Sequence, residues 1–188
     1  MVTVALVENL LPPRLLVLPA SPSLQRTLTQ ATMNKTVEPR HFPPGTGKTY
    51  KLGQMTMTFT TKAEHNQGGY TLCEAVEPPQ SGVSLHRHPT YDETFIICEG
   101  SYAFQLDKAM LTLGPGDTVF VPRGTPHSFL STGPQVGRQI IISSPGGIFD
   151  AFIAEVAASM VDSGSPARPG VAVEFRAIAA KYGMEFLS

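Results

Sequence analysis

The sequence predicts an all-β protein, an antiparallel sandwich or barrel of the jelly-roll type. Residues 50–144 consist of short runs rich in β-branched and aromatic residues, separated by turns rich in glycine, proline, asparagine and aspartate. The chain holds 17 glycines and 17 prolines in 188 residues, which favours frequent tight turns over a helical bundle. Apolar residues make up 41% and charged residues 15% of the chain, a composition that fits a globular domain.

Segments with the length and composition of strands recur along this region. The turn sequences between them include residues 114–117 and residues 122–124. Short strands at this spacing are typical of jelly-roll barrels. The predicted strands are 55–61, 70–75, 94–98, 102–106, 110–113, 118–121, 128–130 and 139–143.

The pattern divides the chain into three parts. Prolines interrupt residues 1–32, so we expect an irregular or disordered extension there, and coherent patterning begins only at Met33. Residues 33–146 form the predicted barrel. Residues 147–188 form a helical tail that we expect to pack on the barrel, because apolar residues recur in it at helical spacing. The two apolar stripes of this tail are Phe149, Phe152, Ile153, Val156 and Met160, and then Phe175, Ile178, Ala179 and Tyr182.

Composition and charge argue against several classes of partner. The formal net charge of -1 gives no electrostatic basis for binding nucleic acid or an anionic membrane. The apolar run at residues 15–18 is too short to span a bilayer, and it lacks the basic segment that opens a signal peptide. Cys73 and Cys98 form no CxxC pair and are interpreted as small buried hydrophobic residues, which fits a reducing compartment. We therefore expect a cytoplasmic protein without nucleic-acid or membrane partners.

Residues 42–49 partly match the sequence motif of a phosphate-binding loop, but they lack its first glycine and its structural context. Phe42 occupies the position of the first glycine of that motif. The loop must also follow a buried strand and open a helix, whereas a strand-like run soon follows it here. We interpret the segment as a connection rich in proline and glycine, and not as a nucleotide site.

Histidines and a glutamate in two short stretches carry the candidate chemistry. His86 and His88 lie two residues apart, and residues two apart on a strand point to the same face. Glu93 follows His88 by five residues, an odd offset that would turn it to the opposite face of an uninterrupted strand. Residues 89–92 must therefore break the strand and reset its phase, which Pro89 favours because it cannot donate to the ladder.

His127 completes the set of candidate ligands. It follows the turn at residues 122–126, at the beginning of a returning strand. Three imidazoles and one carboxylate suit Fe, Mn, Co, Ni, Cu or Zn, so the sequence predicts one divalent transition metal ion of unspecified identity. The remaining histidines, His41 and His65, are interpreted as structural. The predicted ligands are His86, His88, Glu93 and His127.

Phenylalanines in the predicted strands favour an apolar interior around the metal. Such a pocket suits a flat or aromatic organic substrate better than a sugar phosphate, which would call for several inward arginines or lysines. Arg123, in the turn before His127, is interpreted as a solvated residue near the mouth. The interior would be lined by Phe95, Phe104, Phe120, Phe129 or their neighbours.

The two ligand-bearing stretches resemble the paired motifs of the cupin superfamily. The first motif runs glycine, a short spacer, His-x-His, three or four residues, glutamate, six residues and glycine. It is matched with three residues in the first spacer, where five are common in the family. The matching positions are Gly82, His86, His88, Glu93 and Gly100.

The second motif runs glycine, five residues, Pro-x-Gly, two residues, histidine, three residues and asparagine. Ser131 stands where the family usually has asparagine. That asparagine is not a metal ligand in the family, so the departure leaves the implied site intact. The matching positions are Gly116, Pro122, Gly124 and His127.

The predicted two-helix tail, which ends in residues 181–187, is similar to that of small single-domain cupins described as quercetin-dioxygenase-like. This resemblance implies a metal-dependent dioxygenase that acts on a small aromatic or enolisable substrate, with Glu93 as both ligand and general base. It also implies a homodimer. Three alternatives remain open: a redox-neutral isomerase, hydrolase or decarboxylase that uses the same ion, a non-enzymatic cupin that binds a small molecule, and a closed structural zinc site.

Overall fold

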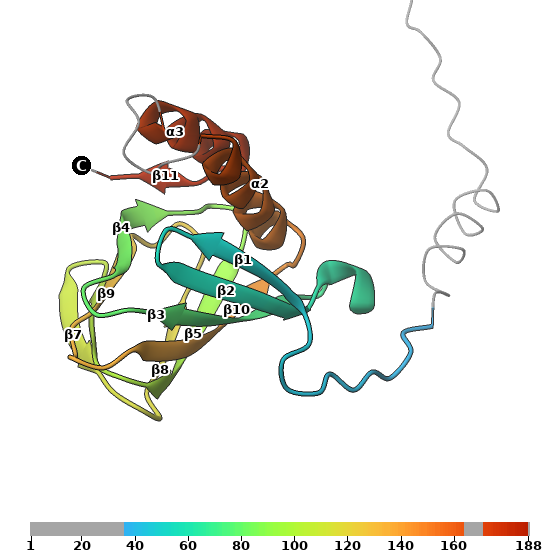
Figure 1. The fold of residues 1–188 in the computed structure, drawn as a ribbon, viewed down its shortest axis with the longest axis horizontal. Helices are drawn as coiled ribbons and strands as arrows, with labels where there is room; N and C mark the ends of the chain where they lie inside the picture. Colours follow the sequence, from blue (N-terminus) through green and yellow to red (C-terminus); the bar gives the residue numbers. More distant parts are fainter. Residues whose placement is uncertain (1–35, 164–170, 188) are drawn as a thin grey trace, which may run out of the picture. The chain divides into compact units, whose positions relative to one another are not determined.

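The computed structural model describes residues 36–163 and 171–187, and it has the all-β jelly-roll architecture that the sequence predicts. Val37–Ser188 form one compact unit. Two antiparallel sheets enclose the core, and helices α2 (Ile148–Ser163) and α3 (Val171–Lys181) lie together over one end of the barrel (Figure 1). The extension expected at residues 1–32 lies outside the described residues.

The larger sheet has six strands in the order β1-β2-β3-β10-β5-β8. Its neighbouring strands pair antiparallel, so residues far apart in sequence, such as those of β3 and β10, meet in one ladder. The strands are β1 (Lys48–Leu52), β2 (Met55–Thr61), β3 (Thr71–Glu77), β5 (Asp92–Glu99), β8 (Thr118–Val121) and β10 (Gly137–Ser144), with a short 3-10 helix η1 (Ala63–His65) between β2 and β3.

The smaller sheet has five strands in the order β11-β4-β9-β6-β7. Its pairing brings the two ligand-bearing stretches side by side, because His86 pairs with His127 between β4 and β9. The strands are β4 (Gly82–Arg87), β6 (Tyr102–Leu106), β7 (Ala109–Leu113), β9 (His127–Ser131) and β11 (Glu185–Phe186).

Strict alternation of burial along the central strands places the core between the sheets. In β5, Glu93, Phe95 and Ile97 point inward and are buried, while their neighbours are more exposed. This is the period of two that an extended strand imposes on its side chains. The aromatic rings of Phe95 and Phe104 meet edge to face at 5.2 Å across the barrel. The interior is therefore apolar, as expected, except where the candidate ligands and a few polar groups enter it.

In β8 the neighbours of Phe120, and not Phe120 itself, face the interior. Phe120 is 58% exposed, whereas its neighbours in β8, Val119 and Val121, are buried. The pairing of β8 with β5 decides which side chains of β8 face inward, because Val121 lies opposite the inward-facing Glu93. A four-residue strand with apolar side chains at three consecutive positions does not reveal from its sequence which face is buried.

Apart from β4, which was expected from the spacing of His86 and His88, two strands were absent from the predicted set for different reasons. β1 is a largely exposed edge strand with lysines at Lys48 and Lys51, so its sequence lacks an apolar stripe. β11 has only two residues, and it exists because Glu185 and Phe186 pair with β4. Strands β2, β6 and β8, by contrast, have the predicted bounds.

The helical tail packs on the barrel with the predicted apolar stripe. Phe149, Phe152, Ile153 and Val156 of α2 are buried in the core. The end of α3 is tied to α2 because Lys181 Nζ and Tyr182 Oη both donate hydrogen bonds to Glu155 Oε2, at 2.6 and 2.7 Å.

Among the described residues, no helix combines the length and the apolar character needed to cross a membrane.

Gly82 opens β4 at a point where β9 passes very close. A Cβ atom at this position would collide with the carbonyl oxygen of Phe129 and crowd the Cα of Leu130. Both obstacles are backbone atoms of a paired strand, so they cannot rotate away as a side chain can. The first glycine of the motif is therefore required by strand packing and not by the chemistry of the site.

We predict that Gly82→Ala destabilises the barrel by about 1–3 kcal/mol, the usual cost of forcing extra atoms into a well-packed interior. Gly114→Ala is the matched control, because no atom lies within 4 Å of the Cβ position there. Urea unfolding followed by circular dichroism measures both variants. Equal midpoints for the two variants would contradict the packing explanation.

Candidate metal centre

The predicted break between the first two ligand-bearing strands is present. β4 ends at Arg87 and β5 begins at Asp92, with no strand between them. The imidazole of His88 folds over this connection: its Nδ1 lies 2.8 Å from the carbonyl oxygen of Tyr91, and its ring stacks on the Tyr91 ring at 3.9 Å. The phase reset is therefore confirmed, and Glu93 Oε2 lies 2.9 Å from His88 Nε2.

The turn before β9 is tied to the same connection. The backbone N–H of Gly124 donates to the carbonyl of His88 at 2.9 Å, and Gly124 adopts a left-handed backbone with φ of 82°. Glycine adopts this conformation at little cost, which explains its place in the turn. His127 follows as the first residue of β9, and its Nε2 lies 3.2 Å from Glu93 Oε2.

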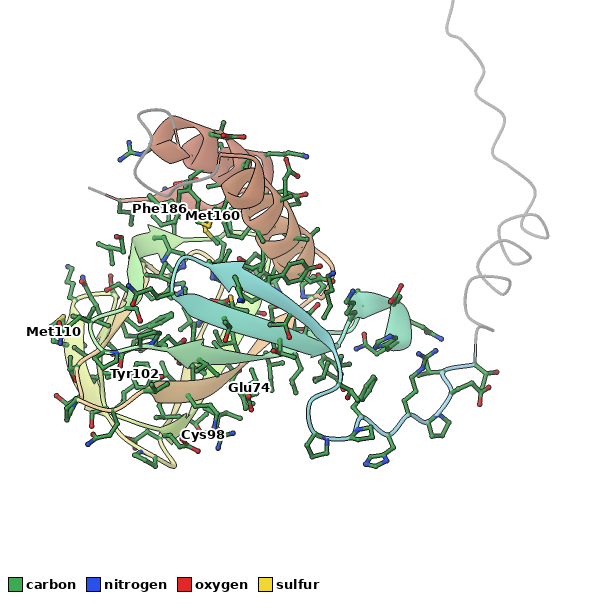
Figure 2. The ribbon with its side chains drawn as sticks, in the orientation of Figure 1. Glu74, Cys98, Tyr102, Met110, Met160 and Phe186 are labelled. Carbon is green, nitrogen blue, oxygen red and sulfur yellow. The ribbon has the colours of Figure 1, made fainter. Side chains whose placement is uncertain are left out.

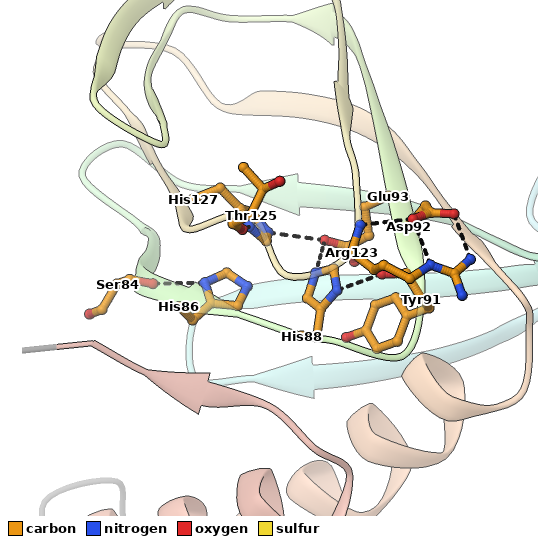
Figure 3. Close-up of polar contacts among 9 residues, drawn as sticks. All are labelled: Ser84, His86, His88, Tyr91, Asp92, Glu93, Arg123, Thr125 and His127. Carbon is orange, nitrogen blue, oxygen red and sulfur yellow. Dashed lines mark hydrogen bonds and ion pairs between the residues drawn. The ribbon is translucent and has the colours of Figure 1, made fainter.

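All four candidate ligands are brought together in the interior. One potential ligand atom from each residue lies within 4.8 Å of the others (Figure 3). Each of these residues is at most 4% exposed. The structure thus unites every side chain that the sequence analysis selected for the site, and the group could hold a metal ion. The residues are His86, His88, Glu93 and His127.

Backbone carbonyls fix the orientation of each imidazole. His86 Nδ1 lies 2.9 Å from the carbonyl oxygen of Ser84, His88 Nδ1 2.8 Å from that of Tyr91, and His127 Nδ1 2.9 Å from that of Thr125. Since a carbonyl oxygen can only accept, each Nδ1 carries the proton, and in the neutral imidazole the lone pair of each Nε2 is available to a metal ion.

Residue types do not indicate these orienting groups, because any residue can supply a backbone carbonyl. Their positions follow from local geometry: two residues before His86 and His127, and three residues after His88. Among these three residues, only Tyr91 also orients an imidazole with its side chain, because its ring stacks on that of His88.

The geometry and chemistry of the cluster fit a bound cation. Nε2 lone pairs from His88 and His127 both face Glu93 Oε2, an arrangement that needs either protonated imidazoles or a positive ion between the ligands. Two ligands that bind one ion at right angles, each at about 2.1 Å, lie about 3 Å apart. The observed separations of 2.9 and 3.2 Å match that spacing.

Burial and mutual contact shift the proton affinities of the cluster. Burial lowers the pKa of His86 to about 4, with the neighbouring His127 acting in the same direction. Burial also acts to lower the pKa of His88, but the hydrogen bond and charge of Glu93 outweigh it, so the net shift is upward. Burial acts to raise the pKa of Glu93, but its bonds to His127 and His88 lower it to about 2. Glu93 is therefore held as a carboxylate.

A clasp of Asp92 and Arg123 joins the two halves of the site. The Arg123 side chain donates to both Asp92 oxygens, through Nε at 3.0 Å and Nη2 at 2.7 Å, and its backbone N–H donates to Oδ1 at 2.8 Å. These bonds lower the pKa of Asp92 to about 2. Arg123 is half exposed near the site, as expected, but it is paired and not simply solvated. Figure 3 shows the clasp beside the ligands.

A cavity of about 290 Å³ adjoins the cluster. His86 and Glu93 contribute to its wall, and apolar side chains from the sheets, from α2 and from the tail form most of the rest. Phe186 of β11 stacks on His86 with ring centroids 5.5 Å apart. The site therefore opens onto an apolar chamber and is not enclosed by protein ligands on all sides.

We predict that metal is lost as the pH falls, because protons compete with the ion for imidazole nitrogens. His88 is protonated first, since Glu93 raises its pKa above the ordinary value of about 6.5. Occupancy should therefore decline through the weakly acidic range and be low near pH 4. Dialysis at each pH followed by elemental analysis measures it, and full occupancy near pH 4 would count against these ligands.

We predict that Arg123→Ala speeds the release of metal to a chelator by up to about fivefold, the scale expected for an exposed ion pair. The clasp no longer holds the turn of His127 against the start of β5. Arg138→Ala is the matched control, because Arg138 pairs with Glu74 and Glu99 on the barrel surface. Wild-type release rates in both variants would show that the clasp does not support the ligands.

Comparison with known proteins agrees with the motifs. Residues 74–142 match the family model described as the cupin domain. An uncharacterized protein of Methanocaldococcus jannaschii is 36% identical over 63 residues, which is 34% of this chain and 50% of that protein. The match thus spans half the length of this curated relative.

Solved structures share the fold at low sequence identity. KdgF from a Halomonas species is 15% identical with a TM-score of 0.53, over 58% of this chain and 96% of that one. The polyketide cyclase RemF from Streptomyces resistomycificus is 20% identical with a TM-score of 0.51, over 57% of this chain and 80% of that one. Residues 74–142 are thus similar in sequence to the cupin domain, and these solved structures share the fold of the barrel.

Proposed function

We propose that this protein is a metal-dependent dioxygenase of the cupin type that acts on a small aromatic or enolisable substrate. The observation that carries the proposal is the placement of three histidines and a glutamate at the wall of an apolar cavity. A structural zinc site is closed by its protein ligands, whereas a catalytic site keeps a position open to substrate. Here the cavity gives a substrate access to the cluster.

The residues present would hold one divalent transition metal ion through three imidazole nitrogens and one carboxylate oxygen. When bound, the ion would act as a Lewis acid toward an enol or phenol oxygen of the substrate and lower its pKa. The identity of the metal is left open by this ligand set, which suits several first-row ions.

Glu93 would act as the general base. Its carboxylate lies inside the cluster and also lines the cavity, so a substrate oxygen beside the ion would be within its reach. An ionised Oε atom of Glu93 can accept the proton that the substrate hydroxyl loses, because a bound ion would lower the pKa of that hydroxyl as well. That oxygen lies 2.9 Å from His88 Nε2 and 3.2 Å from His127 Nε2, so it belongs to the same group of ligand atoms.

The walls of the cavity select an apolar substrate and exclude water. Phe149 and Phe152 of α2, with Phe95 and Phe129 of the sheets, present aromatic surface to the chamber. Among the described residues that line it, none is a lysine or an arginine. A sugar phosphate would lack a partner for its charge, whereas flat aromatic molecules fit such walls.

We predict that metal-loaded protein consumes oxygen with catechols or flavonols, and that Glu93→Gln slows this by at least about 100-fold, the usual contribution of a general base. Metal content is measured in the same samples, so loss of the ion is told apart from loss of the base. Unchanged oxygen uptake with metal retained would remove Glu93 from the mechanism.

Anaerobic turnover separates the alternatives. Conversion of substrate without oxygen would show that the site performs a redox-neutral isomerisation or decarboxylation with the same ligands. Tight binding without turnover under either condition would show a non-enzymatic cupin that binds a small molecule. Either result would overturn the dioxygenase proposal.

A further inference from the structure

A second buried carboxyl group lines the cavity far from the candidate metal. Glu77, the last residue of β3, is fully buried and contributes to the same cavity wall as His86 and Glu93. Through β10, Gly137 pairs with Glu77 and Ser143 pairs with Glu93. Positions 137 and 143 are six residues apart, about 20 Å along a strand at the usual rise. Glu77 and Glu93 therefore lie toward opposite ends of the chamber.

Neutral donors hold the Glu77 carboxyl group in place. Tyr102 Oη donates to its Oε2 at 2.7 Å from the opposite sheet, and Gln139 Nε2 donates to its Oε1 at 2.9 Å. Figure 2 shows Tyr102 well separated from Phe186 and Met160, two cavity residues at the end of the barrel covered by the helices. Each carboxylate oxygen can accept a further hydrogen bond, so the group retains unused acceptor capacity.

Glu77 lacks the counter-charge that a buried carboxylate normally has. Within the part of the chain whose side chains are described, it takes part in no salt bridge. Burial raises its pKa, and the bonds from Tyr102 and Gln139 offset this only in part. Burying such a group is costly, and a glutamine could accept the hydroxyl of Tyr102 without an ionisable group. A purely structural bridge therefore does not account for the carboxyl group.

Other polar atoms around Glu77 also have unused capacity. Gln139 Oε1 and Ser131 Oγ are fully buried and have no hydrogen-bond partner. Gln139 bonds directly to Glu77, and Ser131 pairs with Tyr102 between β9 and β6. Buried polar atoms normally find partners, so these unpaired atoms mark a polar region around Glu77, which is the member of the group that lines the cavity.

We propose that Glu77 is a second recognition point of the cavity and that it accepts a hydrogen bond from a hydroxyl group at the far end of the substrate. The inference rests on the proposed function in one respect, namely that the same molecule has an oxygen at the metal centre. The substrate class is then an elongated, largely apolar molecule with a metal-binding oxygen at one end and a hydroxyl group at the other.

Paired ligands test this assignment on the metal-loaded protein. One ligand is a catechol joined through a chain of about eight carbons to a phenol ring, which lets its two ends span the length of the chamber, and the other has the same structure without the phenolic hydroxyl. Calorimetric titration gives the dissociation constant of each. We expect the wild type to favour the hydroxylated ligand by about tenfold or more, the effect of one hydrogen bond to a charged group.

Variants of β3 separate recognition from folding. Glu77→Gln should reduce the preference to threefold or less, while Glu74→Gln, on the outer face of the same strand, should leave it at the wild-type value. A double variant, Glu77→Met with Tyr102→Phe, removes the carboxyl group without leaving the tyrosine hydroxyl unpaired, and it should abolish the preference. Circular dichroism and metal content show that each variant is folded and loaded.

The outcomes distinguish this inference from the dioxygenase proposal. A wild type without preference, including one that binds neither ligand, overturns the role of Glu77, as does a preference that persists in both Glu77 variants. Loss of the preference in these variants without any oxygen consumption by the wild type supports Glu77 and contradicts the dioxygenase. Oxygen consumption by the wild type, together with a preference that is unchanged in the Glu77 variants, supports the dioxygenase and contradicts the role of Glu77.

Discussion

The interruption of strand pairing between Arg87 and Asp92 is the constraint on which the site depends. A continuous strand would turn Glu93 away from His88, because side chains alternate between faces. The interruption folds His88 back onto Tyr91, through a 2.8 Å contact with the carbonyl oxygen and stacking of the two rings, and returns Glu93 to the interior. The turn before His127 is bonded to the same connection through Gly124, so both ligand-bearing stretches are positioned by one loop.

The barrel gives this polar cluster an apolar setting, and that setting accounts for its chemistry. Burial lowers the pKa of His86, while the contacts of Glu93 with His127 and His88 lower the pKa of Glu93 and keep it ionised. A buried carboxylate with imidazole lone pairs directed at it is costly unless a positive charge is present. The tail adds a further wall, since Phe186 both pairs with the strand of His86 and stacks on its ring. Fold, ligand placement and cavity are therefore parts of one arrangement.

Much of this arrangement could be predicted from the sequence, because it depends on short-range patterns. The strand parity of His86, the odd offset of Glu93 and the alternation of the central strands are all local features. The remainder depends on tertiary contacts. The inward or outward direction of Phe120 is decided by the pairing of β8 with β5, and β11 forms only because β4 offers an edge. Residue types also do not predict which backbone carbonyls orient the imidazoles, or that Glu77 lies beside the cavity.

The central claim is that His86, His88, Glu93 and His127 together hold one metal ion, and the metal content of histidine variants tests it most directly. Each histidine of the cluster is replaced by alanine, with His65→Ala as the control, because His65 lies in η1 and outside the cluster. Elemental analysis after purification without added metal should find about one transition metal ion per chain in the wild type and in the control, and little in the cluster variants, since ligand loss abolishes such sites. Equal metal content in all of these proteins would contradict the account.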